Sequence, residues 1–184
     1  TLLILNTAII ASQPLYKNLP FDVARDFQAV AMLGFAAYVL TVNQSVPAKT
    51  VQELIALAKK EPGKYSYASG SSSAIVSGAT FARLAGIDLL HVPYKSSPPA
   101  LTDVIAGRVS MMFIDVPTGL PHVNAKALKS LAVTTKKRSA LLPDIPTLKE
   151  AGVDGVDVQQ WYGFFAPAKT PKPIVVDRYA FKSD

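Results

Sequence analysis

The sequence predicts an α/β fold with a largely parallel sheet. Strand-like apolar segments alternate with segments of helical periodicity along the chain of 184 residues, which is the order that βαβ units produce. Hydrophobic residues make up 49% of the chain and charged residues 17%, which is the balance of a globular protein with a sizeable core. No apolar run reaches the roughly 18–20 residues that a transmembrane helix needs.

The first predicted elements are strands separated by a long connection. Residues 2–5 form an apolar strand candidate, and a polar loop is expected from Asn6. Prolines punctuate the connection that follows. Residues 29–33 and 38–42 are two further apolar stretches, which we interpret as strands.

The clearest helix start lies at Thr50. Glu53 follows three residues later and completes a capping box, in which the cap residue and the third helical residue satisfy exposed backbone N–H groups. Apolar side chains then repeat at helical spacing at Val51, Leu54, Ile55 and Ala58. Pro62 and Gly63 end this pattern, so an amphipathic helix is predicted between Thr50 and Pro62.

The alternation continues to the end of the chain. Strands are predicted at residues 65–68, 89–92, 109–114, 128–134 and 161–166. Helices are predicted at residues 74–84, from 98 to the glycine at 107, and at 117–124, with a last helix opening at the prolines at 171 and 173.

A small-residue loop between a predicted strand and a predicted helix is the most informative segment for function. We call it the Ser loop, and it consists of Ser69, Gly70, Ser71, Ser72 and Ser73. Small side chains let a ligand approach the backbone, and the N–H groups at a helix start bind anions such as carboxylates. In open α/β sheets, ligands lie beyond the carboxyl ends of the strands, where this loop is expected. A simple Ser-capped turn explains the same residues equally well.

Other kinds of site find little support in the sequence. The phosphate-loop and dinucleotide-binding glycine patterns are absent, and the Ser loop lacks the Gly-x-Ser-x-Gly elbow of hydrolases. A serine, His91 and Asp115 could converge as a hydrolase trio, which we keep as a minor alternative. The chain has no cysteine, and its two histidines, His91 and His122, have no paired acids nearby. We therefore expect no metal site and no cofactor.

Several single residues have two interpretations each. Asp115, at the end of the predicted strand 109–114, either accepts a hydrogen bond from a ligand or caps the helix that follows. Lys95 either offsets a carboxylate charge or is solvated, and His91 is expected to hydrogen-bond locally. Trp161 and Tyr162 either line a cleft or belong to the core.

The net charge of +6 favours anionic partners. Its basic residues are scattered, and the only tight run is Lys136, Lys137 and Arg138. Such a short run is typical of a solvated loop, so nucleic-acid binding is not predicted. A positive surface that attracts small carboxylates fits the composition better.

Short motifs in a fixed order run through nearly the whole chain. They occupy residues 18–22, 25–27, 46–59, 91–95, 99–103, 119–122, 131–134, 143–147, 150–152, 166–168 and 170–173. In sequence and order this series resembles the receptors of tripartite tricarboxylate transporters, the Bug-type solute-binding proteins. The resemblance predicts a type II periplasmic-binding-protein fold, with residues 39–160 as one complete lobe and residues 1–38 with 161–184 as part of the other.

The resemblance also implies that the protein binds a ligand reversibly and catalyses no reaction. Such proteins reside in the periplasm, close on a small organic acid about a hinge, here near residues 39–43 and 160–163, and deliver it to membrane permease subunits. Family ligands include di- and tricarboxylates, acidic amino acids and aromatic acids, held by loop amides and ordered waters. By position, the Ser loop would bind the carboxylate, Asp115 would help to select the far end of the ligand, and Asn6 and Thr7 would lie in a first-lobe loop near the cleft.

This chain departs from the family pattern at several points, and these departures limit which family properties can be assigned to it. The Ser loop is shorter than the commoner Gly-Asn-Gly-Ser/Thr form, and the family's N-terminal Pro-Gly-Gly loop is absent, so the bound acid is not predicted. We interpret the apolar residues 1–11 as a strand and loop rather than a signal peptide, and the chain as a fragment. A half-built lobe would expose apolar surface and favour dimers. A receptor that signals to a membrane partner stays open as an alternative to transport.

Overall fold

The computed structural model describes residues 2–15 and 17–179. The chain divides into two compact units: unit 1 comprises Thr1–Phe35 with Gln160–Asp184, and unit 2 comprises Ala36–Gln159. The predicted lobe boundaries at 38/39 and 160/161 lie close to these divisions. Each unit is described by itself below.

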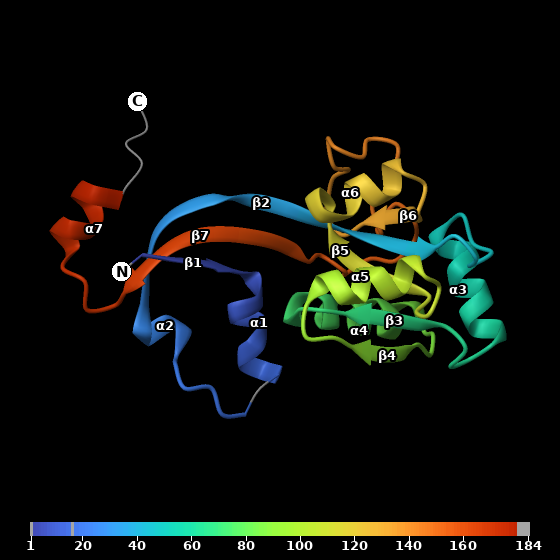
Figure 1. Cartoon of the computed structure of the whole chain (residues 1–184), viewed down its shortest axis with the longest axis horizontal. Coiled ribbons are helices and arrows are strands. Elements are labelled where there is room, and N and C mark those ends of the chain that lie inside the picture. The colour runs from blue at the N-terminus through green and yellow to red at the C-terminus, as the bar shows by residue number, and fades with distance from the viewer. Residues whose placement is uncertain (1, 16, 180–184) are drawn as a thin grey trace. The chain divides into compact units, whose positions relative to one another are not determined.

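Unit 1 is built on paired strands with short helices (Figure 1). Its elements are β1 (Leu3–Asn6), α1 (Thr7–Leu15), α2 (Val23–Asp26), the first part of β2 (Phe27–Asn43), β7 (Gln159–Pro167) and α7 (Lys172–Tyr179). β1 and β7 are antiparallel, and β7 lies between β1 and β2 in the strand order.

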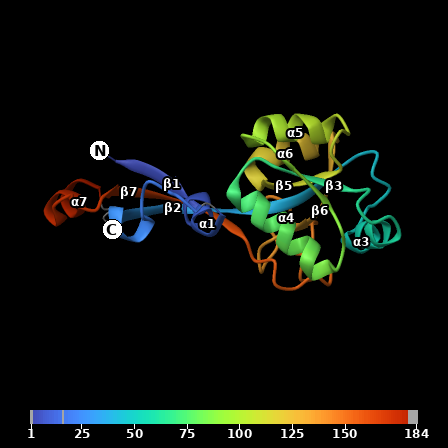
Figure 2. The same cartoon turned by 90° about the horizontal axis from the view of Figure 1, so that it is seen from below.

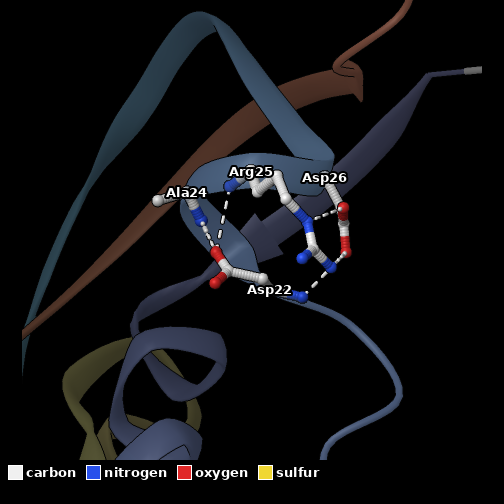
Figure 3. Close-up of polar contacts among 4 residues, drawn as sticks. All are labelled: Asp22, Ala24, Arg25 and Asp26. Atoms are coloured by element: carbon white, nitrogen blue, oxygen red, sulfur yellow. Dashed lines mark hydrogen bonds and ion pairs between the residues drawn. The ribbon is translucent and has the colours of Figure 1, made fainter.

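The short helix α2 begins at an aspartate cap (Figure 3). The Asp22 carboxylate accepts hydrogen bonds from the backbone N–H groups of Ala24 and Arg25, at 2.9 and 3.0 Å. Asp26 in turn accepts from the Asp22 backbone N–H at 2.8 Å and pairs with the Arg25 guanidinium. These local bonds satisfy the exposed donors of the first turn, which is why a helix of one turn forms here.

The sheet of unit 2 is mixed. Its order is β6 (Leu128–Val133), the second part of β2, β5 (Met111–Asp115), β3 (Ser66–Ser69) and β4 (Leu90–Pro93). β3 is parallel to β4 and β5, whereas β2 is antiparallel to both of its neighbours. The predicted α/β class is confirmed, but a largely parallel sheet holds only for β3, β4 and β5.

Four helices cover the two faces of this sheet (Figure 2). They are α3 (Val51–Lys60), α4 (Ser72–Ala85), α5 (Ser97–Ile105) and α6 (Val116–Asn124). Alternate residues of β5 enter different core clusters. Met111 and Phe113 pack with residues of α3 and α4, whereas Met112 and Ile114 pack with residues of α5 and α6. This alternation is the strand periodicity of two, so both faces of β5 are buried.

The two described core clusters consist entirely of unit 2 residues. In unit 1, large apolar side chains of the strands are exposed, such as Ile4, Met32 and Phe35. The dimerisation predicted from such a surface stays a prediction. No described helix combines the length and apolar character that crossing a membrane requires.

Most predicted elements are present within a few residues. α3 begins at the Thr50 cap, whose hydroxyl accepts from the Glu53 N–H at 3.1 Å, while the Glu53 carboxylate accepts from the Lys49 N–H at 2.6 Å. α4 ends at Gly86, which has the left-handed φ of 63° that helix ends favour. α7 begins close to the expected proline-marked start.

Two expectations about the first 43 residues are wrong, and one helix there was missed. The loop predicted from Asn6 is instead helix α1, with Pro14 in its last turn. The two separate strands predicted at 29–33 and 38–42 are one continuous strand, β2, because the glycine between them continues the extended backbone. The short helix α2 was not predicted, since its signal is limited to the Asp22 cap.

Candidate functional site

Three helices begin at one edge of the unit 2 sheet. β3, β4 and β5 run parallel, so their carboxyl ends lie at the same edge, and each is followed within a few residues by α4, α5 or α6. The Ser loop joins β3 to α4, as predicted. This edge is the position at which open α/β sheets bind ligands.

The Ser loop supplies the first turn of α4. The helix begins at Ser72 rather than at the predicted position 74, and Ser71 is its cap, with its hydroxyl accepting from the Ala74 N–H at 3.2 Å. The N–H groups of Ser72 and Ser73 precede the first intrahelical donor, so they point out of the helix start without an intrahelical acceptor. The Ser73 hydroxyl oxygen is buried and has no hydrogen-bond partner among the described residues.

Ser69 is buried and makes hydrogen bonds within unit 2. Its side chain is 1% exposed, and its hydroxyl oxygen lies 2.6 Å from Nε2 of His91 on β4. Its carbonyl accepts from the Tyr94 N–H at 2.8 Å. His91 is hydrogen-bonded, as predicted, but its partner lies 22 residues away in the sequence rather than close by. A serine beside a histidine is the pairing that a hydrolase nucleophile needs, but the burial of Ser69 closes it to a substrate carbonyl.

Gly70 brings two loops into backbone contact. A Cβ atom at this position would lie 2.3 Å from the carbonyl carbon of Ser96 and 2.3 Å from the amide nitrogen of Ser97. No real side-chain carbon approaches another backbone this closely, so only glycine fits here. The start of α5 is therefore packed against the Ser loop, a neighbour that sequence reasoning missed because it depends on strand order.

The loop after β4 is held by a charged cluster. The Tyr94 hydroxyl donates to one Asp103 carboxylate oxygen at 2.6 Å, and Arg108 donates to the other at 2.6 Å. Both bonds lower the pKa of Asp103, and the bond from Tyr94 has the larger effect. The bond between Tyr94 and Asp103 also raises the pKa of the Tyr94 hydroxyl. Lys95, next along the loop, is exposed and takes part in none of the ion pairs among the described residues.

A Tyr94→Phe variant is expected to raise the pKa of Asp103 towards its ordinary value of 3.8, because the largest stabiliser of the charged carboxylate is removed. Because the pKa of Asp103 is lower in the folded state, its charged carboxylate stabilises the fold at pH values above its ordinary pKa. This stabilisation is lost as the pH falls through the pKa of the folded state. The variant's stability should therefore fall less steeply below about pH 4 than that of the parent. Carbon-detected NMR titration of Asp103 measures the shift.

The Glu150 carboxyl is the internal control for this titration. Its pKa is lowered by the Thr147 backbone N–H and by Arg138, neither of which the substitution touches. An Asp103 titration that coincides in parent and variant would contradict the assigned role of Tyr94.

Asp115 caps α6. One of its carboxylate oxygens accepts from the Thr118 N–H at 3.0 Å and from the Thr118 hydroxyl at 2.6 Å. The capping interpretation is thus confirmed, while the role of Asp115 in selecting a ligand stays a prediction. Its side chain is at the edge of the sheet where the Ser loop lies.

Asn6 and Thr7 belong to unit 1, at the junction of β1 and α1. The Thr7 hydroxyl accepts from the Trp161 N–H at 2.9 Å, and the Trp161 ring packs 5.8 Å from that of Phe165. Trp161 therefore makes contacts within unit 1, but Trp161 and Tyr162 are half-buried and belong to neither described core cluster. The ligand contacts assigned to Asn6 and Thr7 stay predictions.

The described residues give no competing metal site, and a cavity of unit 2 is poorly suited to an anion. A cavity of about 480 Å³ lies elsewhere in unit 2, and its lysines pair with its aspartates, Lys136 with Asp157 and Lys149 with Asp154. It offers no uncompensated charge to an anion. Among the described residues, no group of three or more histidines or carboxylates is arranged to hold a metal ion.

Comparison with known proteins identifies the family. The family described as tripartite tricarboxylate transporter family receptor matches residues 1–183. The chain belongs to this family. The resemblance stated from the sequence motifs is thereby confirmed.

Relatives and solved structures agree with this assignment. The chain is 36% identical over 178 residues to a UPF0065 protein from the tcbD-tcbE intergenic region of Pseudomonas sp. strain P51, covering 95% of this chain and 53% of the relative. It is 30% identical to BugT of Bordetella pertussis, covering 88% of this chain and 50% of BugT. The chain spans about half the length of the curated relatives that it matches.

Two solved receptor structures match with high similarity. The periplasmic binding protein BugD superposes with a TM-score of 0.87 at 28% identity, covering 95% of this chain and 59% of BugD. R. palustris Rpa4515 with adipate superposes with a TM-score of 0.84 at 34% identity, covering 88% of this chain and 55% of that one. The predicted periplasmic-binding-protein fold is confirmed for this family member.

Proposed function

We propose that this receptor captures a small organic carboxylate in the periplasm and presents it to a membrane transporter, with the carboxylate bound at the start of α4. The observation that carries the proposal is the group of unused donors there. The N–H groups of Ser72 and Ser73 lack intrahelical acceptors. These donors, with the positive end of the helix dipole, favour an anion.

The other two helix starts at this edge suit an anion less well. In α5 the second and third positions are Pro98 and Pro99, which have no N–H to donate. In α6 the cap is the carboxylate of Asp115, which repels an anion. The start of α4 has neither handicap, and the exposed ammonium group of Lys95 belongs to the neighbouring loop.

The ligand class follows from the family and the site together. Related structures carry adipate and malate, both dicarboxylates, in Rpa4515 and in MatC of Rhodopseudomonas palustris. Reversible binding requires no nucleophile or cofactor, and the described site supplies donors rather than an accessible base. The permease subunits of a tripartite tricarboxylate-type transporter are the proposed partners.

A charge substitution in the 184-residue chain tests the proposal. Ser72→Asp adds a negative charge at the first helical position, where it stabilises the helix but repels a carboxylate. We expect binding of adipate or malate to weaken about tenfold or more, while the unfolding free energy is unchanged or rises. Isothermal titration calorimetry and urea unfolding measure the two quantities.

Ser72→Asn is the matched control, since it has nearly the same size without the charge. It should retain affinity within about threefold of the parent. The uncharged diamide of adipate should not bind to any of the three proteins. Equal affinities in the Asp and Asn variants, or a parent that binds neither acid, would overturn the proposal.

A further inference from the structure

A stacked pair of rings joins β3 and β4 close to the Ser loop in sequence. The Tyr67 ring on β3 packs against α4 at Gly78, where a Cβ atom would come within 2.3 Å of the ring. The His91 ring also stacks on Tyr67, with ring centroids 4.7 Å apart and planes inclined by 18°. The imidazole is thus held in a defined plane by its neighbour on the adjacent strand.

The strand register directs this imidazole at Ser69. Tyr67 and His91 are register partners in the parallel pair of β3 and β4, and Ser69 is two residues further along β3. Side chains two residues apart on a strand share a face, so one imidazole contacts both Tyr67 and Ser69. Its Nε2 lies 2.6 Å from the Ser69 hydroxyl oxygen.

This hydrogen bond holds the first residue of the Ser loop. Ser69 is 1% exposed, and Gly70, which follows it, is in backbone contact with Ser96 and Ser97. Burial lowers the pKa of His91, so the imidazole is neutral at pH 7 and pairs with the hydroxyl without bringing a charge into the sheet. A buried hydroxyl that loses such a partner is costly to retain in the same place.

We propose that His91 is a positioning residue, which holds Ser69 and thereby keeps the amides of the Ser loop in place for a carboxylate. This inference rests on the proposed function, because it assigns His91 a part in the same site. His91 itself needs no contact with the ligand.

Three variants separate the hydrogen bond from the packing of the ring. His91→Phe keeps a ring to stack on Tyr67 but loses Nε2, and it should weaken binding of adipate or malate about tenfold. His91→Gln, which restores an amide nitrogen or oxygen near the position of Nε2, should return the affinity to within about threefold of the parent. Ser69→Ala should weaken binding to the same extent as His91→Phe.

The double variant Ser69→Ala with His91→Phe tests whether the two residues act through one bond. Its affinity should be no weaker than that of either single variant, since the shared bond is already lost. Additive losses, or a His91→Phe variant that binds as the parent does, would overturn the proposal.

Hydrogen exchange of the ligand-free chain gives a readout that needs no ligand. His91→Phe should speed exchange of the hydrogen-bonded amides of Ala74, Ile75 and Tyr94, whose acceptors lie in the Ser loop, about tenfold, with the amides of α3 unchanged as the control. Unchanged exchange of these three amides would overturn the proposal. If the parent binds neither acid while His91→Phe still loosens the loop, the proposed function fails and the hold of His91 on the loop stands.

Discussion

Gly70→Ala is expected to destabilise unit 2 by about 3 kcal/mol and to weaken carboxylate binding by more than about tenfold. The added Cβ atom would lie 2.3 Å from the backbone of Ser96 and of Ser97. Backbone atoms cannot rotate away as a side chain can, so the Ser loop and the start of α5 must separate. Such a separation displaces the amides of Ser72 and Ser73 from their positions at the start of α4. Urea unfolding and calorimetric titration with adipate and malate measure both effects.

Gly86→Ala is the matched control for this substitution. Gly86 has a left-handed φ of 63°, and a Cβ atom there would meet nothing within 4 Å. Its replacement should therefore cost only the backbone strain of about 1–2 kcal/mol and leave the affinity unchanged. If Gly70→Ala loses no more stability than Gly86→Ala and binds as the parent does, the contact between the two loops is not as described.

Phe113→Ala is expected to reduce the unfolding free energy by about 3–5 kcal/mol. Phe113 is 1% exposed at the centre of β5, and its ring packs edge-on at 5.8 Å from the ring of Phe81 on α4. Removing it leaves a cavity between the sheet and this helix. A loss of this size is a large fraction of the stability of a typical domain, so urea unfolding should show it clearly.

An exposed apolar residue of the same unit is the control for the cavity. Leu141 is 56% exposed, and Leu141→Ala should change the unfolding free energy by no more than about 0.5 kcal/mol. Comparable losses in the Phe113 and Leu141 variants would contradict the assigned core of unit 2.

Local signals in the sequence predicted the elements that surround the candidate site. The capping box at Thr50, the glycine at position 86 and the prolines at 98 and 99 each act within one or two helical turns, so their neighbours in sequence are also their partners. The same holds for the position of the Ser loop, since a short buried strand directly followed by a helix places the loop at the sheet edge.

The details of the site were beyond the reach of such signals. The four serines of the Ser loop are chemically identical in the sequence. In the structure, however, the Ser69 hydroxyl is hydrogen-bonded to His91, and the Ser71 hydroxyl caps helix α4. The buried Ser73 hydroxyl instead has no hydrogen-bond partner in the part of the chain that the structure describes. Which serine keeps a donor depends on where the helix starts and on which strand lies beside β3.

The sequence by itself determined the α/β class, most helix starts, the family and the position of the Ser loop between a strand and a helix, because periodicity, capping and motif order are written in consecutive residues. Only the tertiary structure decided that β2 runs antiparallel to β5, that Gly70 abuts Ser96, and that His91 reaches Ser69. These contacts join residues more than 20 positions apart, and they depend on strand order and register, which no local pattern encodes.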